Sequence, residues 1–264
     1  MEFLLLVFAG AGVGFAIGLT GVGGGSLMTP ILLLFGYSAP VAIGTDLLYA
    51  AITKSSSALS HHRHGNVHWR IVLVLGLGSI PASLVVHLLL ANSSFQQSPE
   101  FEELLTFSLG IMLLLTSLIL LGRDRIRQSA LTNRPAALME AIHKNRAFFT
   151  LTMGAVLGAC VTLSSVGAGA FGAAILLTIY SQVSAIRIVG TDIAHAVPLT
   201  LFAGSGYLLS GYVDWQLLAA LLLGSLPATH FGSRVGTRVS ERQLQRVMIL
   251  ILTCLGIYYS LGLH

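Results

Sequence analysis

Ten apolar runs fill most of this chain and limit the folds that it can adopt. A membrane-spanning helix needs about 20 apolar residues. The third, fourth and fifth runs of each half are long enough, whereas the first two runs of each half are short. The ten runs lie at roughly 3–19, 26–37, 41–60, 70–91, 104–122, 147–163, 170–182, 186–209, 215–232 and 244–262.

Charge is scarce along the whole chain. Only 9% of the 264 residues are charged and 55% are hydrophobic, whereas a soluble domain carries about 25% charged residues. So few charges cannot cover a water-facing surface, which predicts an all-α integral membrane protein in a lipid bilayer. The basic residues cluster in short loops beside apolar runs, so the net charge of +4 does not indicate a nucleic-acid partner.

Glycine breaks the first apolar segment of each half. The stretch Gly21-Val22-Gly23-Gly24-Gly25-Ser26 interrupts the run from 3 to 37, and a weaker copy at 164–170 interrupts the run from 147 to 180. Each glycine costs a helix interior about 1 kcal/mol relative to alanine. The backbone groups that a break exposes are tolerated only inside protein or beside a wet cavity. Such breaks in matching positions predict the binding site of a transporter.

The two halves repeat one another at an offset of 146 residues. The letters GTD occur at 44–46 and 190–192, GxVxW at 65–69 and 211–215, and GSxPA at 78–82 and 224–228. Matches in this order and register are not expected from apolar composition alone. They predict two copies of one unit, each made of a short broken-helix hairpin and three transmembrane helices.

Loop charges predict that the two copies are inverted. The loop at 61–70 is basic, whereas its second-half counterpart at 210–215 has no basic residue. The loop at 92–103 is acidic, whereas its counterpart at 233–243 is basic. Because basic loops stay in the cytoplasm, matching loops lie on opposite sides. Both termini are expected on the outer, periplasmic side of the inner membrane, and the sequence leaves open whether the hairpins cross or only dip in. The predicted units are an N-terminal repeat at 1–122 (hairpin 3–37, helices 41–60, 70–91 and 104–122), a cytoplasmic connector at 123–146, and a C-terminal repeat at 147–264 (hairpin 147–182, helices 186–209, 215–232 and 244–262).

These motifs give the chain a family resemblance. The run GLTGVGGGSLMTPILL (18–33), the GTD at 44–46, GNVHW at 65–69 and GSIPAS at 78–83 resemble the sulfite exporter TauE/SafE family of membrane anion transporters. The resemblance implies transport of sulfur-containing anions such as sulfite or organosulfonates. The second copy departs from the pattern at its tip, where Ala170 and Phe171 replace Gly24 and Gly25.

The broken tips are the first candidates for substrate binding. A helix N-terminus presents unpaired N–H groups and a partial positive charge, and N–H groups near glycines form concavities that bind anions. The alternative is that these small residues only allow helices to pack closely. The candidates are Thr20, Gly23, Gly24, Gly25, Ser26, Ser164, Ser165, Gly167 and Gly169.

Four further residues are ionisable groups within apolar runs. Asp46 and Asp192 are candidates for binding a coupling proton or Na⁺, because charge inside a membrane is costly and therefore indicates function; they could instead cap the helices that they begin. Lys54 is the candidate for attracting the anion, unless it snorkels to the cytoplasmic interface. His195, one turn after Asp192, could join a proton path or be a packed histidine.

These features together predict a secondary transporter of a small anion that works by alternating access. We expect no enzyme activity, cofactor or metal site, and the sequence leaves homo-oligomerisation open. Two rival hypotheses remain. One is an anion channel, and the other is a metal-cation transporter that uses the histidines at 61–64, which a solvated loop explains more simply.

Overall fold

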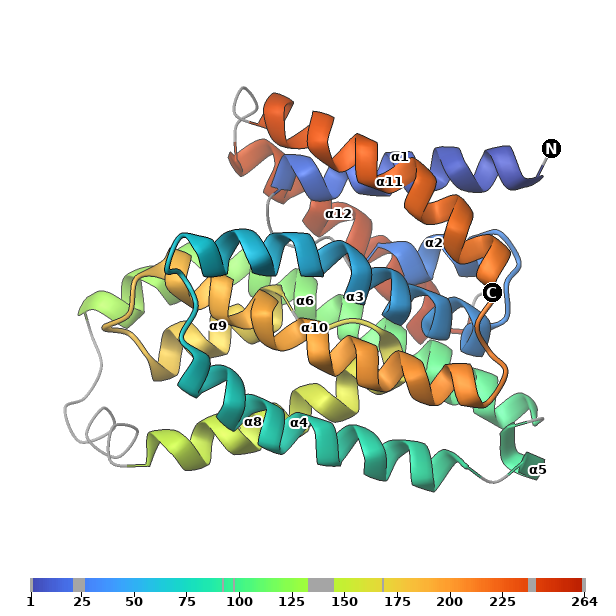
Figure 1. Cartoon of the computed structure of the whole chain (residues 1–264), viewed down its shortest axis with the longest axis horizontal. Helices are drawn as coiled ribbons and strands as arrows, with labels where there is room; N and C mark the ends of the chain where they lie inside the picture. The colour runs from blue at the N-terminus through green and yellow to red at the C-terminus, as the bar shows by residue number, and fades with distance from the viewer. Residues whose placement is uncertain are drawn as a thin grey trace.

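The computed structural model is built of helices, and it describes residues 2–20, 27–91, 93–96, 98–132, 145–167, 169–236 and 241–262. The elements follow the order of the predicted runs (Figure 1). Their bounds are α1 Glu2–Thr20, α2 Met28–Leu34, α3 Ala39–Arg63, α4 Trp69–Leu90, α5 Ser93–Gln96, α6 Pro99–Thr132, α8 Arg146–Ser164, α9 Ala170–Ile179, α10 Ala185–Leu209, α11 Trp215–Gly236 and α12 Glu241–Ser260.

The helices confirm an all-α membrane protein. Of the described helices, α4, the part of α6 at Pro99–Gly122, α8 and α10 are long and apolar enough to cross a bilayer. Large apolar side chains lie exposed on their outer faces; on α4, Leu73, Leu77 and Leu88 are each about two-thirds exposed. Such surfaces are stable against lipid tails and unfavourable in water.

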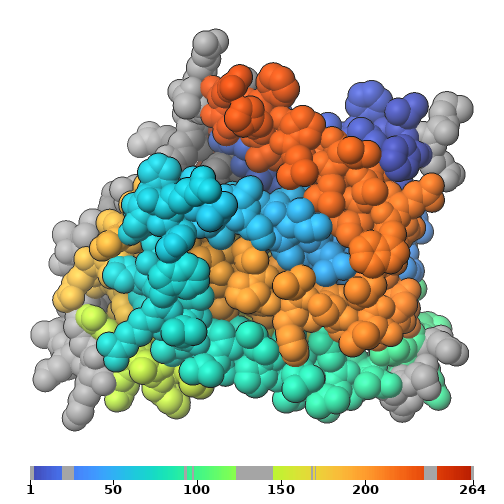
Figure 2. All heavy atoms as spheres, viewed as in Figure 1, coloured from blue at the N-terminus to red at the C-terminus, as the bar shows by residue number. Residues whose placement is uncertain are grey.

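Helices from the two halves of the chain alternate through the molecule. Helix α1 packs along α11 and α8 packs along α4, while α3 pairs with α10 and α6 pairs with α12. In Figure 2, the face toward the viewer shows α11, α3, α10 and α4 in turn, so first-half and second-half segments interleave. Each broken hairpin therefore packs mainly on a helix of the other half.

Glycines allow close packing of α1 on α11 and of α8 on α4. On α1, Gly10, Gly14 and Gly18 face the backbone of α11, and a Cβ added at any of them would collide with it. On α8, Gly154 and Gly158 face α4 in the same way. Small residues four apart let membrane helices approach until their backbones touch. Glycines within α1 and α8 thus allow these helices to pack closely, and whether the tip glycines do the same stays a prediction.

Matching contacts relate the two halves. The backbone N–H of Asp214 donates to Thr45 Oγ1 (3.2 Å), and that of His68 donates to Thr191 Oγ1 (3.0 Å). Position 45 corresponds to 191, and position 68 to 214, at the 146-residue offset. An internal two-fold relation would produce such reciprocal contacts. The orientation of the halves in a membrane and the predicted repeat boundaries stay predictions.

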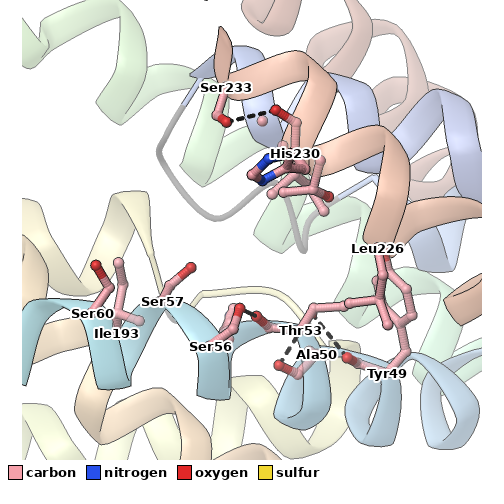
Figure 3. Close-up of a pocket in the computed structure, with 14 residues that line it drawn as sticks. Tyr49, Ala50, Thr53, Ser56, Ser57, Ser60, Ile193, Leu226, His230 and Ser233 are labelled. Carbon is pink, nitrogen blue, oxygen red and sulfur yellow. Dashed lines mark hydrogen bonds between the residues drawn. The ribbon is translucent and has the colours of Figure 1, made fainter.

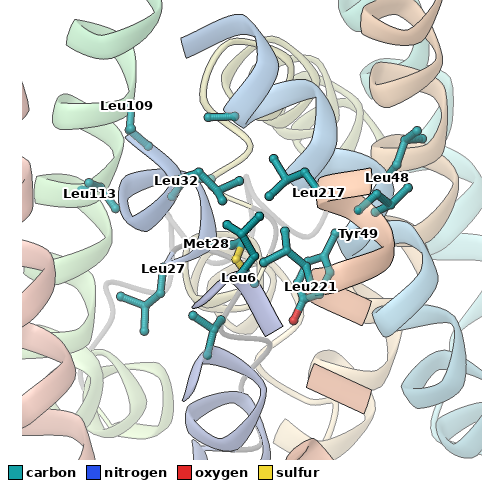
Figure 4. Close-up of a cluster of buried hydrophobic side chains, with 14 of the residues drawn as sticks. Leu6, Leu27, Met28, Leu32, Leu48, Tyr49, Leu109, Leu113, Leu217 and Leu221 are labelled. Atoms are coloured by element: carbon teal, nitrogen blue, oxygen red, sulfur yellow. The ribbon is translucent and has the colours of Figure 1, made fainter. Parts of the chain in front are cut away.

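The first hairpin is anchored by an apolar cluster. Leu6 of α1 and Met28 and Leu32 of α2 are buried with Leu217 and Leu221 of α11 (Figure 4). A second cluster joins α8 and α9 to α4 and α10. These contacts hold the short helices α2 and α9, which have 7 and 10 residues and are too short to span a bilayer.

The chain termini and the helix ends that flank the predicted connector lie at opposite ends of the molecule. The N- and C-terminal ends lie at the same side in Figure 1, and the ends of α6 and α8 that flank the predicted connector lie at the other. Helix α6 continues to Thr132, past the expected end at 122, because hydropathy marks the end of the apolar run and not the end of the hydrogen-bonded backbone. Residues 133–144 of the predicted connector lie outside the described part.

Candidate transport site

The carboxylate of Asp46 lies at the start of the short helix α2. Its Oδ2 accepts hydrogen bonds from the backbone N–H of Thr29 (3.2 Å) and from Thr29 Oγ1 (2.5 Å). Asp46 itself belongs to α3 and is fully buried. A carboxylate in this position satisfies one of the free N–H groups at a helix start and interacts favourably with its partial positive charge.

The second aspartate has the equivalent position in the other half. Asp192 of α10 is buried, and the backbone N–H of Gly169, the residue before α9, lies close enough to interact with its carboxylate. Gly172 on the first turn of α9 leaves the space that Asp192 Oδ1 fills, since a Cβ there would collide with this oxygen. Each short helix therefore begins against a carboxylate from the following long helix.

Asp46 and Asp192 lie at the starts of the short helices α2 and α9, and not at the starts of their own helices. Asp46 and Asp192 both lie two turns inside their own helices, α3 and α10. The alternative that each caps the helix it begins is therefore wrong. Each instead meets the start of the short helix that precedes it in the chain. Sequence reasoning missed this arrangement because capping between separate helices leaves no fixed spacing in the sequence.

Asp46 also connects the two hairpins. Ser165, the residue after α8, lies close enough for its hydroxyl to interact with the Asp46 carboxylate. Within the described part of the chain, Ser165 Oγ and Asp46 Oδ1 are buried without a hydrogen bond that meets normal geometry. Asp46 thus lies between Thr29 of the first hairpin and Ser165 of the second.

Lys54 supplies a positive charge to this centre. Its side chain is only 7% exposed, so it is buried rather than snorkelling to an interface. The ammonium group interacts electrostatically with Asp46 and with Asp192. We call Asp46, Lys54 and Asp192 the charge cluster.

A cavity of about 450 Å³ opens beside the charge cluster. In Figure 3, Thr53, Ser56, Ser57 and Ser60 follow α3 along one wall, and His230 and Ser233 of α11 lie across from them. Among the described residues that line it there are hydroxyls, Lys54 and His230, but no carboxylate. The lining consists of Ile17, Gly18, Tyr49, Ala50, Thr53, Lys54, Ser56, Ser57, Ser60, Ile193, Leu226, Thr229, His230 and Ser233.

His195 and Tyr49 occupy equivalent positions at the 146-residue offset. His195 is fully buried on α10, and its Nε2 shares a hydrogen bond with Ser79 Oγ of α4 (2.8 Å). Tyr49 lies on α3 beside Ser225 of α11, the residue that corresponds to Ser79. Tyr49 lines the cavity, whereas His195 is not among the described lining residues.

The predicted tip residues divide into three groups. Ser164 Oγ is engaged locally, donating to the Cys160 carbonyl (2.7 Å). Ser165, Gly167 and Gly169 form the turn with positive φ values of 58°, 126° and 137°. The side chain of Thr20 and the residues Gly23, Gly24, Gly25 and Ser26 lie outside the described part.

The histidines near the end of α3 are spread over separate contacts. His64 Nδ1 donates to the Ser60 carbonyl (2.7 Å), and His62 Nδ1 accepts from Trp69 Nε1 (3.3 Å). His61 packs against Gly190 of α10. Among the residues that the structure describes, no group of three or more His, Cys, Asp or Glu side chains is arranged to hold a metal ion.

Comparison with known proteins identifies the family. The family model of the sulfite exporter TauE/SafE matches residues 6–259. The chain belongs to the sulfite exporter TauE/SafE family. It is a multi-pass membrane transporter of this family, as the resemblance in sequence predicted.

Several curated membrane proteins match this chain over nearly their whole length. The probable membrane transporter protein YjnA of Bacillus subtilis is 38% identical over 253 residues, covering 96% of this chain and 97% of that protein. YdhB of the same organism, also named a probable membrane transporter protein, is 27% identical over 264 residues, covering 95% and 96%. Comparison with solved structures returned no match.

Sequence reasoning missed most of the cavity. Tyr49 could have been found by subtracting the offset of 146 from the position of His195. Thr53, Lys54 and Ser57 share one helix face by their spacing of three to four residues, and extending that face by one turn gives Ser60. His230 also lines the cavity. The side chains of α11 could not be placed, because nothing in the sequence says which helix faces α3.

Proposed function

We propose that this protein is a secondary transporter that moves a small anion across the cytoplasmic membrane by alternating access. The substrate class that fits best is a sulfur oxyanion or organosulfonate, with sulfite as the first candidate. Membership of the TauE/SafE family supports transport, and the name of the family suggests the substrate.

The observation that carries the choice of an anion is the lining of the cavity. Lys54 contributes a positive charge, and the hydroxyls of Ser57 and Ser60 lie along one face of α3. The hydroxyls of Thr53 and Ser56 line the same wall and donate to the carbonyls of Tyr49 (2.9 Å) and Thr53 (3.0 Å), so their O–H protons are already engaged. An oxyanion has several acceptor oxygens and binds well where a cation and several O–H groups converge. A cation would meet no carboxylate among the described lining residues.

The starts of the short helices are less suited to hold the anion by themselves. Asp46 accepts from Thr29, and Asp192 lies against Gly169 and Gly172, so carboxylates of the chain already occupy both positions. An anion approaching α2 or α9 would meet like charge. We therefore place substrate binding at Lys54 and the hydroxyls of the cavity.

The charge cluster gives a reason for ion coupling. Two buried carboxylates and one ammonium carry one excess negative charge when all are ionised. An anion beside them is repelled, and the repulsion is strong where water is scarce. Protonation of Asp46 or Asp192, or binding of Na⁺, removes the repulsion. We propose that such a proton or sodium ion moves together with the anion. His195 interacts electrostatically with Lys54, so its charge also acts on the charge cluster.

The test is a flux measurement with purified protein in liposomes. Sulfite, thiosulfate, sulfate, a sulfonate and a small carboxylate are compared, each with and without proton and sodium gradients. We expect saturable flux of at least one sulfur anion that a proton or sodium gradient accelerates. Failure of every anion under every gradient overturns the proposal, and ohmic single-channel currents support the channel instead.

The metal-cation hypothesis is tested in the same liposomes. Replacing His61, His62 and His64 together with alanine should leave anion flux intact. Metal flux that disappears in this variant, with no anion flux in the parent, favours the rival.

We propose in addition that the basic ends of α3 and α11 face the cytoplasm and both termini face the periplasm.

A further inference from the structure

The cavity has a counterpart in the other half of the molecule. Adding 146 to the cavity residues of α3 gives residues of α10: Ser57 corresponds to Ala203 and Ser60 to Gly206. The same offset relates Ser233 of α11 to His87 of α4. Because α3 faces α11 and α10 faces α4 through matching contacts, these counterparts face one another as the cavity walls do.

This counterpart is closed by direct contact. His87 Nε2 donates to the carbonyl of Ala203 (3.0 Å), and Ala203 is fully buried. The imidazole of His87 lies so close to Gly206 that a Cβ at that position would overlap the ring. The imidazole of His87 on α4, lying against Gly206 on α10, therefore fills the space that corresponds to the open cavity between α3 and α11.

A second contact holds the same closure. The ring of Tyr207 meets His87 edge-on at 5.4 Å, and its hydroxyl donates to the Thr162 carbonyl (2.9 Å). Thr162 in turn donates from Oγ1 to Ser83 Oγ (2.7 Å). Tyr207 thus ties α10 to both α4 and α8 at the level of His87.

The equivalent positions on the cavity side are apart. Ser57 and Ser60 of α3 are exposed, and they line the space that separates them from Ser233 of α11. Figure 1 shows α3 and α11 separating toward their C-terminal ends. One passage is therefore open and its counterpart is shut in one structure, on opposite sides of the charge cluster.

We propose that a second access path to the charge cluster runs between α10 and α4, and that His87 seated over Gly206 is the gate that closes it. This inference rests on the proposed transport function. The gate opens when α10 and α4 separate as α3 and α11 do here, and the anion then leaves past Thr200, the counterpart of Lys54. Thr200 is a neutral hydroxyl, so the anion is held less tightly on that side.

Cysteine labelling tests the gate without any substrate. Cys160 and Cys254 are replaced with alanine in the full-length protein, and a single cysteine is placed at Ser57 or at its counterpart Ala203. The purified proteins are reconstituted in nanodiscs, where both faces are open to a small water-soluble thiol reagent. We expect the cysteine at 57 to react at least about tenfold faster than the cysteine at 203, since reaction follows the population of the open state.

Loosening the gate should reverse this difference in part. His87→Ala removes the bond to Ala203 and leaves space over Gly206. We expect the labelling rate at 203 to rise about threefold to tenfold, the population shift that loss of one hydrogen bond produces, and the rate at 57 to fall. Gly76→Ala on the same helix is the matched control, because a Cβ there meets nothing within 4 Å. Gly206→Ala is the second gate variant if His87→Ala is not monodisperse.

Each outcome decides a different question. Unchanged labelling at 203 in folded gate variants overturns the gate. Faster labelling at 203 with undiminished labelling at 57 overturns alternation and indicates a continuous pore. The expected labelling combined with no anion flux in liposomes leaves the gate in place and removes the proposed substrate.

Discussion

Burying Lys54 takes an ammonium group out of water, which costs several kcal/mol unless nearby charges offset it. Asp46 and Asp192 interact with it electrostatically, and both are buried themselves. The three groups therefore depend on one another. A charge placed here for stability alone could be replaced by apolar residues, so its presence in a cavity wall indicates use in binding.

Lys54 gives the first prediction. Lys54→Gln removes the positive charge and should lower the initial rate of anion flux about tenfold or more, which corresponds to about 1.4 kcal/mol of binding. Arg70→Gln is the matched control, because Arg70 is exposed at the start of α4, outside the cavity. Flux is measured in liposomes at equal protein content. Flux at the parent rate in Lys54→Gln would contradict a role for Lys54 in attracting the anion.

Gly172 gives a second prediction at the same scale. Gly172→Ala places a methyl group where Asp192 Oδ1 lies, so the carboxylate must move away from the start of α9. We expect gradient-driven flux to fall about tenfold, with a stability loss of about 1–3 kcal/mol from overpacking. Gly12→Ala is the control, because a Cβ at Gly12 meets nothing within 4 Å. Equal flux in both variants would show that the position of Asp192 is unimportant.

Between elements, the aspartates act as caps as well as charges. Asp46 joins α3 to α2 through Thr29, and Asp192 joins α10 to α9 through Gly169. A short helix of seven residues is not stable by its own hydrogen bonds. The position of α2 therefore depends on Asp46 and on the apolar cluster around Met28 and Leu32.

Two substitutions separate the cap from the charge. Asp46→Asn keeps an oxygen that can accept from Thr29, and asparagine caps about as well as aspartate. Asp46→Ala removes the cap and should cost about 0.5–2 kcal/mol of stability. We expect thermal unfolding in detergent to be lowered in Asp46→Ala and nearly unchanged in Asp46→Asn, while gradient-driven flux falls in both. A stable Asp46→Asn variant with full coupling would mean that Asp46 is only a cap.

The elements also show where sequence reasoning succeeds. Hydropathy located α4, α6 and α10 as long helices, because lipid-facing and buried positions are both apolar. The expectation that the run at 147–163 is too short to span is wrong, because α8 continues to Arg146 and Ser164 and is long enough. The offset of 146 related Thr45 to Thr191, and the structure gives both the same kind of contact. The partners of Asp46 and the separation of α3 from α11 were not predictable, since they depend on which helices meet in space. The first glycine tip lies outside the described residues, so its predicted role stays a prediction.

At the scale of the molecule, each hairpin packs mainly against a helix from the other half. The glycine face of α1 lies on α11, and that of α8 lies on α4. In isolation, a first half would leave Gly10, Gly14 and Gly18 without the backbone that they fit. It would also lack Leu217 and Leu221 from the cluster that anchors α2. The halves are therefore expected to be stable only together.

A split protein tests this interdependence. A fragment of residues 1–132 and a fragment of residues 145–264 are expressed separately and together, and the amount of each in the membrane is measured. We expect either fragment alone to accumulate about tenfold less than the pair, because unsatisfied membrane fragments are degraded. Gly14→Leu in the first fragment should abolish the rescue, since a side chain there collides with Ser225 of α11, whereas Gly12→Leu should preserve it. A first fragment that accumulates alone as a folded, monodisperse species would show instead that the repeats are independent units and that the exchange of α1 and α8 is not what holds the molecule together.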